Sequence, residues 1–314
     1  MTATIHIADV IKHYNKVEAV RGVSFDLAAG EMVALIGHNG AGKTTLMKMM
    51  LGLIRPTRGT IAVLGENPAA GEFSSRRQLG YLPENVAFDA ALSGRETQAF
   101  YARLKREPVQ EALALLDIVG LGDAAKRRVN TYSKGMRQRL GLAQALIGRP
   151  RVLLLDEPTT GLDPELRQTF YDVIQKLAAE GTTVLLSSHA LTELEERAGR
   201  VIIMNRGLKV ADGTLEELRR LARLPTRIRV KVANLPPAGR PAWLPATASY
   251  RRINGHIVEI DAAPNEKIEL LRRATADGTA VQDLELIPPN LDELYAHFLR
   301  GRDGGPAGDG GTRP

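Results

Sequence analysis

The most constraining feature of this chain is the stretch GHNGAGKTT, which begins at Gly37. It completes the pattern G-x-x-x-x-G-K-[ST], closing with Gly42, Lys43 and Thr44. The apolar run MVALI before it predicts a buried strand, and helical spacing of apolar residues follows it. Glycines allow backbone N–H groups to turn toward an anion, and a helix N-terminus adds a favourable dipole. The stretch therefore predicts a loop that binds the phosphates of a nucleotide.

In such a loop the lysine reaches the β- and γ-phosphates, and the hydroxyl after it is offered to Mg²⁺. We assign these roles to Lys43 and Thr44, with ATP as the nucleotide. A glycine-rich turn without chemical meaning is the alternative, and the strand–loop–helix context disfavours it. The residues expected to bind the nucleotide here are Gly37, His38, Asn39, Gly40, Ala41, Gly42, Lys43, Thr44 and Thr45.

A second apolar run, VLLL from Val152, ends in Asp156 and Glu157. Ligands of parallel sheets bind at the carboxyl ends of the strands, where both acids should lie. Asp156 is suited to holding Mg²⁺ and Glu157 to polarising the attacking water. Two acids after a strand more often form a cap or a turn, but the phosphate loop favours the catalytic interpretation.

Strand and helix patterns alternate through the first two thirds of the chain, which predicts an α/β fold with a mostly parallel sheet. The strands expected over Ile5–Val10 and Val20–Leu27, and a hairpin over Arg200–Val210, add antiparallel elements, so the sheet should be mixed. After Leu224 the pattern changes to a small α+β domain over residues 225–300. The glycine-rich tail 301–314 has almost nothing apolar and is expected to be disordered.

Composition excludes several classes of protein. The 314 residues include no cysteine, so there is no thiolate metal site, and no apolar run is long enough to span a bilayer. The N-terminus lacks a signal-peptide pattern, which makes the cytoplasm the expected compartment. In the densest basic stretch, Arg227, Arg229 and Lys231 alternate with apolar residues and no aromatic residue interleaves. This is typical of a solvated strand face, so we expect no nucleic-acid partner.

Further motifs lie between and around these two: LGYLPE from Leu79, YSKGM from Tyr132, TGLD from Thr160 and SSH from Ser187. As a set, over residues 4–220, they resemble the ATP-binding subunits of ABC transporters. The resemblance implies a P-loop NTPase of ABC type over residues 1–224. It would have a mixed sheet, an antiparallel β subdomain and a helical subdomain over about 85–150.

The resemblance also implies roles for single residues. Tyr14 would stack on adenine, with an ordinary core or loop tyrosine as the less favoured alternative. His189 would touch the γ-phosphate. Ser133 and Gly135 would bind the γ-phosphate held by a second subunit, with a plain serine N-cap as the simpler alternative, and Asp163 would link the two sites of a homodimer.

Two departures from the family pattern concern the site. Lys134 and Met136 replace a glycine and a glutamine of the usual LSGGQ signature. Glu84 stands where the family has glutamine, and its carboxylate could approach Mg²⁺ or its water. The resemblance makes residues 85–105 the surface that receives a helix of an integral membrane permease subunit.

The stretches YLPENVAF, LSGRET, ARLK and TYSKGMRQRLGLAQAL resemble one branch more closely. It is the ATPase subunit of the transporter that supports maturation of the copper site of nitrous oxide reductase, which works with a periplasmic accessory protein. An exporter of lipid, drug or polysaccharide is the alternative. Soluble ABC ATPases of ribosomes or DNA usually carry two ATP modules or a coiled-coil insertion, and this chain has neither. The expected location is the cytoplasmic face of the inner membrane, as a peripheral protein.

Overall fold

The computed structural model describes residues 3–70, 74–233, 240–276 and 280–303. The chain divides into two compact units, Met1–Thr214 and Leu215–Pro314. The boundary precedes helix α7 (Leu215–Ala222), whereas the sequence predicted it after Leu224, because α7 packs against helix α9 of the second unit. Helix α9 runs from Leu291 to Asp303 and so includes the first residues of the expected tail. The rest of that tail lies outside the described residues.

A six-stranded sheet forms the centre of the first unit, in the order β5-β6-β7-β3-β8-β9. Neighbouring strands from β5 to β8 are parallel, and β9 is antiparallel to β8, which confirms the mixed sheet and the hairpin. Every residue of β3 and β6 is buried, as expected for strands covered on both faces. The strands are β3 (Met32–Ile36), β5 (Leu79–Leu82), β6 (Val152–Asp156), β7 (Thr183–Ser188), β8 (Arg200–Asn205) and β9 (Leu208–Gly213).

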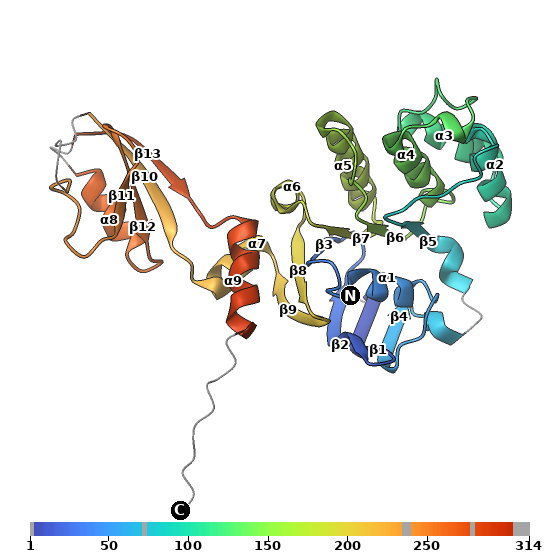
Figure 1. The fold of residues 1–314 in the computed structure, drawn as a ribbon, viewed down its shortest axis with the longest axis horizontal. Helices are drawn as coiled ribbons and strands as arrows, with labels where there is room; N and C mark the ends of the chain where they lie inside the picture. Colours follow the sequence, from blue (N-terminus) through green and yellow to red (C-terminus); the bar gives the residue numbers. More distant parts are fainter. Residues whose placement is uncertain (1–2, 71–73, 234–239, 277–279, 304–314) are drawn as a thin grey trace, which may run out of the picture. The chain divides into compact units, whose positions relative to one another are not determined.

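An antiparallel sheet of order β2-β1-β4 lies on one side of the central sheet (Figure 1). Its strands are β1 (Ile5–Tyr14), β2 (Val17–Leu27) and β4 (Arg58–Val63). Helix α1 (Lys43–Met50) packs into the apolar core shared by the two sheets, with Leu46, Met47, Met49 and Met50 fully buried. The methionines therefore fill the core, as their spacing predicted.

Helices cover the opposite side of the central sheet (Figure 1). The helical subdomain contains α2 (Gly94–Lys105), α3 (Val109–Ile118) and α4 (Lys134–Ala145), and α5 (Pro164–Ala179) and α6 (Leu191–Glu195) follow. Buried Gln98 of α2 joins the three subdomain helices, because its Nε2 donates to the carbonyls of Ala112 and Ala143. Short 3₁₀ turns occur at Pro68–Ala70, Ser74–Gln78 and Val129–Thr131. None of the described helices is both long and apolar enough to cross a membrane.

The second unit contains an antiparallel sheet of order β11-β12-β10-β13, with helix α8 and the α7–α9 pair. Apolar residues of one face form the core, and the other face carries charges. Across it, Arg229 pairs with Glu259 at 3.2 Å and with Glu285 at 3.0 Å. Ion pairs therefore occupy the basic face of β10, as the interpretation of a solvated face predicted. The elements are β10 (Thr226–Val232), β11 (Tyr250–Arg252), β12 (Ile257–Ala262), α8 (Lys267–Ala274) and β13 (Val281–Ile287).

Candidate active site

The predicted phosphate loop joins β3 to α1, and two of its glycines are sterically required. A Cβ at Gly37 would lie 2.6 Å from the Met204 carbonyl oxygen, and one at Gly42 would lie 2.5 Å from that of Ala19. Gly42 is also the N-cap of α1, with φ 102°, and no side chain caps this helix. Because no side chain bonds the first N–H groups of α1, these groups and the positive end of the helix dipole are available to an anion.

Lys43 is buried within this loop, with 6% of its surface exposed. Its Nζ donates to the carbonyl oxygen of Gly37 at 2.6 Å and lies 3.7 Å from Oε1 of Glu157. The ammonium is thus held between the loop backbone and one of the two predicted acids. Because the site is partly dehydrated, this charge acts more strongly on an anion than an exposed lysine would.

Asp156 ends β6 and accepts two hydroxyl hydrogen bonds. Thr44 Oγ1 donates to its Oδ2 at 2.7 Å, and Ser187 Oγ donates to its Oδ1 at 2.7 Å. The structure therefore brings together two of the three residues predicted to approach Mg²⁺, Thr44 and Asp156. Hydroxyl and carboxylate oxygens suit this ion, which also keeps waters and takes phosphate oxygens. Among the described residues no group of three His, Cys, Asp or Glu side chains could hold a metal, so an ion here would depend on the Thr44 hydroxyl, the Asp156 carboxylate and phosphate oxygens together.

Glu157 has φ 49°, an uncommon value for a residue other than glycine. Its N–H donates to Ser187 Oγ at 2.9 Å, and its Oε2 lies 2.7 Å from Nδ1 of His189. A carboxylate only accepts hydrogen bonds, so Nδ1 of the imidazole is the donor in this contact. The two predicted catalytic residues are thus in direct contact, and Ser187 restrains the backbone that presents the carboxylate.

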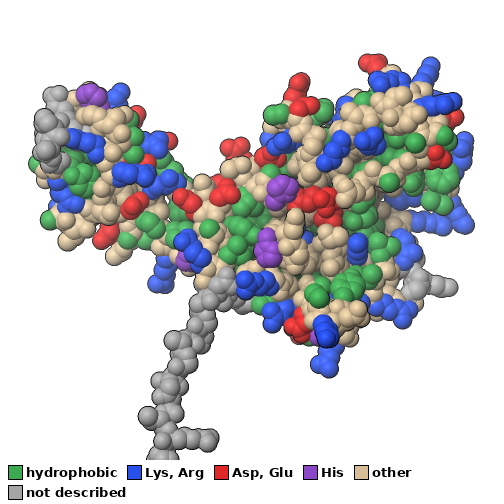
Figure 2. Space-filling model, in the orientation of Figure 1, with side chains coloured by type: hydrophobic (Ala, Val, Ile, Leu, Met, Phe, Trp, Pro, Cys, Tyr) green, Lys and Arg blue, Asp and Glu red, His purple; other side chains and the backbone are tan. Residues whose placement is uncertain are grey.

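Lys43, Thr44, Asp156 and Glu157 line one cavity of about 790 Å³, whereas Ser187 and His189 contact the two acids but are not part of its lining. Tyr14, at the end of β1 and 43% exposed, lies on its wall, and Glu84 lies beside the phosphate-loop residues and both acids. Figure 2 shows basic side chains in several groups on one face of the first unit, and Arg21 and Arg206 line this cavity. The structure therefore places Tyr14 and Glu84, the two outlying residues named from the sequence, on the wall of the same cavity as the phosphate loop.

Ser133 and Gly135 do not line this cavity. Ser133 is the N-cap of α4 and accepts from the Met136 N–H at 3.2 Å, so the simple capping interpretation holds within one chain. A Cβ at Gly135 would lie 3.4 Å from Cδ2 of Leu162. The start of α4 thus packs against the TGLD loop, and its role toward a second subunit stays a prediction.

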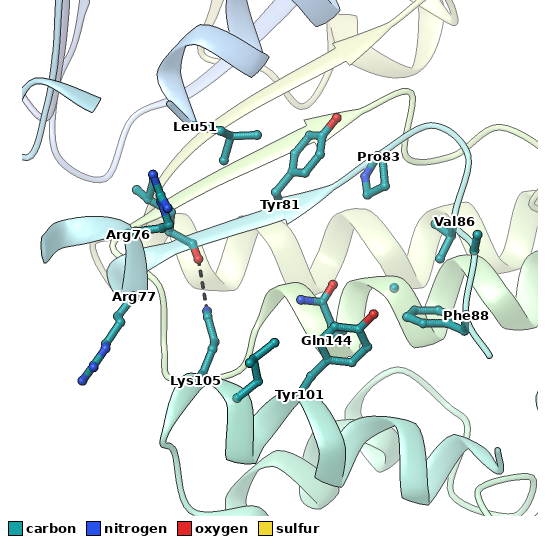
Figure 3. Close-up of a pocket in the computed structure, with 14 residues that line it drawn as sticks. Leu51, Arg76, Arg77, Tyr81, Pro83, Val86, Phe88, Tyr101, Lys105 and Gln144 are labelled. Atoms are coloured by element: carbon teal, nitrogen blue, oxygen red, sulfur yellow. Dashed lines mark hydrogen bonds between the residues drawn. The ribbon is translucent and has the colours of Figure 1, made fainter. Parts of the chain in front are cut away.

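A second cavity, of about 860 Å³, lies between β5 and α2 (Figure 3). Lys105 on its wall donates to the carbonyl oxygens of Leu79 at 3.1 Å and Ile147 at 2.8 Å, and burial lowers the pKa of this lysine. Burial, with the negative charge of Asp156, raises the pKa of Tyr81 to about 12. Several lining residues belong to the predicted docking stretch 85–105: Val86, Ala87, Phe88, Tyr101, Leu104 and Lys105.

Three residues of the first site were missed from the sequence. Ser187 was noted only as part of a histidine motif, although a polar residue at the end of an apolar strand is a usable signal. Asn205, at the tip of the β8–β9 hairpin, lies 2.9 Å from Nε2 of His38 through its Oδ1. Arg206 follows it and lines the cavity. A hairpin tip distant in sequence gives no local sign that it supports a phosphate loop.

The family model described as ABC transporter matches residues 20–160. Three relatives match over nearly the whole chain. They are the daunorubicin resistance ATP-binding protein DrrA3 of Streptomyces coeruleorubidus (34% identity; 91% of this chain, 93% of the relative), the Nod factor export ATP-binding protein I of Rhizobium meliloti (34%; 96% and 89%) and the linearmycin resistance ATP-binding protein LnrL of Bacillus subtilis (32%; 94% and 97%).

Solved structures resemble the first unit in fold. An ATP-binding subunit of an ABC transporter is similar with a TM-score of 0.66 and 32% identity, over 70% of this chain and 93% of that one. A dimeric bacterial ABC transporter cassette has a TM-score of 0.62 at 24% identity, over 67% and 98%, which supports the fold alone.

Proposed function

Because this chain belongs to the ATP-binding proteins of ABC transporters, we propose that it is the ATPase subunit of an exporter of a lipid, drug or polysaccharide. The proposal of an exporter rests on how much of this chain aligns with relatives that are named for export or drug resistance. The relatives named for daunorubicin resistance, Nod factor export and linearmycin resistance align with 91%, 96% and 94% of this chain. These alignments therefore extend beyond the first unit, which alone would indicate only an ABC ATPase.

In this proposal ATP binds in the cavity of about 790 Å³. The adenine stacks on Tyr14, and the phosphates enter the loop at the N-terminus of α1, where backbone N–H groups and Lys43 bind them. Thr44 and Asp156 would hold Mg²⁺, which supplies charge neutralisation at the phosphate oxygens when bound. Glu84 shares the wall and could approach the ion or its water.

Glu157 acts as the general base for the attacking water. Its Oε2 is already fixed by the Nδ1 donor of His189, at 2.7 Å, and its backbone by Ser187. The other carboxylate oxygen, Oε1, lies on the side of Lys43 and accepts the proton of the water. His189 both orients this carboxylate and reaches toward the γ-phosphate with its opposite edge.

A second copy of the chain completes the site. Ser133 and Gly135 lie outside the cavity of their own chain, at the start of α4. We propose that the N-terminus of α4 from one subunit closes on the γ-phosphate in the other, where its dipole favours negative charge. Two ATP molecules then join a homodimer, and hydrolysis releases it.

The groove between β5 and α2 would receive the membrane subunit (Figure 3). Phe100 and Leu104 of α2 are 53% and 68% exposed, and they lie on the same helix as Tyr101 of the cavity wall. Tyr101, Phe88 and Val86 extend the apolar surface. A helix of the permease laid here would bury it and would hold the ATPase at the membrane as a peripheral subunit.

The test uses the chain together with its membrane subunit, reconstituted in vesicles. We expect ATP-dependent transport of an apolar drug such as daunorubicin, and Glu157→Gln should bind ATP but reduce hydrolysis and transport to background. The exposed Arg273→Ala serves as the matched control. Normal ATP hydrolysis by Glu157→Gln would remove the general base from the proposal. A complex that hydrolyses ATP but transports neither daunorubicin nor a lipid or polysaccharide would remove the exporter.

A second candidate function is the maturation of nitrous oxide reductase, which the resemblance of the stretches YLPENVAF and TYSKGMRQRLGLAQAL supports. The relatives named above favour the exporter instead. Co-purification separates the two: a membrane subunit alone supports export, whereas an added periplasmic partner, with loss of copper from the reductase when the gene is deleted, supports maturation.

A further inference from the structure

The TGLD loop, residues 160–163, connects two parts of the proposed site. It leads into α5, where Asp163 is the N-cap and accepts from the Leu166 N–H at 2.9 Å. Just inside α5, Arg167 turns back to the loop, and its Nε donates to the carbonyl oxygen of Leu162 at 2.9 Å. The loop is therefore held to the first turn of α5 by both a cap and an arginine.

The same arginine reaches a second element. Its Nη1 donates to Oε1 of Glu193, which lies on the short helix α6 immediately after His189. The two side chains are 37% and 24% exposed, so this ion pair is partly shielded from solvent. One planar guanidinium thus bonds the loop through Nε and the segment after His189 through Nη1, an arrangement that a lysine cannot reproduce.

The loop also contacts the start of α4 on its other side. A Cβ at Gly161 would lie 2.9 Å from Cδ and 3.2 Å from Nζ of Lys134, and a Cβ at Gly135 would lie 3.4 Å from Cδ2 of Leu162. The loop therefore lies between the start of α4, which is proposed to face the ATP of the other subunit, and Arg167, which reaches the segment after His189.

We propose that Arg167 is a positioning residue for hydrolysis. Through its bonds to Leu162 and Glu193 it links the dimer-facing loop to the segment that carries His189. When the second subunit presses on the loop, Arg167 transmits the shift to His189, and the histidine aligns Glu157. This inference rests on the proposed function, because it requires the shared two-subunit site.

The alternative is that Arg167 only stabilises the α5–α6 contact. Further contacts join α5 to the segment just after α6, including the pairing of Arg197 with Gln168 and the position of Arg197 over the Tyr171 ring at 4.8 Å. Because this second set remains in an Arg167 variant, the fold should persist, and an effect confined to turnover can be distinguished from a loss of stability.

The test measures ATPase kinetics, ATP-driven dimerisation and thermal unfolding of the full chain carrying Arg167→Ala, Arg167→Lys, Glu193→Ala or the Arg167→Ala/Glu193→Ala pair. Arg167→Ala should lower kcat by about tenfold, with the KM for ATP and the melting temperature nearly unchanged. Arg167→Lys should keep most of this defect, since it retains the charge but loses the two-point contact. The double variant should be no slower than the slower single variant.

Arg273→Ala is the matched control, because Arg273 pairs through its Nε with Glu269 at 2.8 Å on α8 of the second unit, and its kcat should equal that of the wild type. A kcat within twofold of the wild type for Arg167→Ala would overturn the inference. A fall in kcat that is fully explained by a smaller folded fraction of the variant would overturn it as well. Full activity of Arg167→Lys would show that charge alone suffices and would overturn it too. A wild-type chain without ATPase activity removes the proposed function itself, and this inference with it.

Discussion

Ser187 offers the sharpest test of how the acidic centre is held, through the substitution Ser187→Ala. The side chain is fully buried, and its hydroxyl both donates to Asp156 Oδ1 at 2.7 Å and accepts from the Glu157 N–H at 2.9 Å. Removing it leaves a carboxylate oxygen and an N–H buried without these partners.

The magnitude follows from these two bonds. A bond to a charged group contributes about 1.5–3 kcal/mol, and an orphaned buried N–H costs about 1–3 kcal/mol. Since the vacated space relaxes and the terms overlap, we expect a loss of about 3 kcal/mol in the free energy of unfolding. For a unit of this size, that lowers Tm by roughly 6–12 °C. Because the strained Glu157 backbone loses its restraint, kcat should also fall about tenfold.

The assay is thermal unfolding of the full chain together with steady-state ATP hydrolysis. Thr183→Val is the control, because it removes another buried hydroxyl from the same strand, one that donates to the Ala28 carbonyl at 2.9 Å far from the acids. It should cost about 1 kcal/mol and leave kcat unchanged. If Ser187→Ala matched this control in both stability and kcat, the reasoning about the acidic centre would be wrong.

Three further outcomes are expected. Tyr14→Ala should raise the KM for ATP by about tenfold, and Tyr14→Phe should not, because an aromatic face contributes roughly 1.4 kcal/mol of stacking; equal KM values for Ala and wild type would exclude stacking. Glu84→Gln should lower the KM for Mg-ATP by about two- to fivefold in titrations, since it removes one negative charge from the cavity wall; a higher KM would indicate that the carboxylate helps to hold the ion. Burial raises the pKa of Glu259, but the bonds from Arg251 and Arg229 outweigh it and leave the pKa below its ordinary 4.5. The pairing therefore stabilises the fold above that pH and is lost as the pH falls through the lowered pKa, so urea titrations from pH 7 to 3 should show a loss that Glu259→Gln lacks.

Local patterns were sufficient for much of the fold. The phosphate loop, the buried strands β3, β6 and β7, and the core methionines of α1 all follow from short-range spacing. The domain boundary did not, because α7 has the same amphipathic pattern whichever unit it joins, and only its packing against α9 decides. Helix α9 likewise continues through Gly301, where composition predicted a tail.

The candidate site shows the same division. Residues inside motifs could be named from the sequence alone. Ser187 contacts Asp156 only because β6 and β7 pair in a register that sets the two residues opposite each other. That register depends on parallel pairing between strands 31 residues apart at these positions, and no local signal encodes it. Asn205 and Arg167 similarly act through partners distant in sequence.

The position of Lys43 beside Glu157 suggests how nucleotide binding could change the environment of the carboxylate. Its ammonium now lies 3.7 Å from Glu157 Oε1, while Oε2 accepts from His189. In the proposed function, a triphosphate in the loop would compete with the carboxylate for that ammonium, and because it carries more negative charge, Lys43 would turn toward the phosphates. Glu157 then loses one cationic neighbour, and its Oε1 becomes free to accept a proton from water while His189 still fixes the other oxygen. In the proposed mechanism, ATP binding and activation of the base would thus follow from one change of partner of Lys43. The residues proposed to hold Glu157, Ser187 directly and Arg167 through the segment after His189, would then set the orientation of the freed carboxylate.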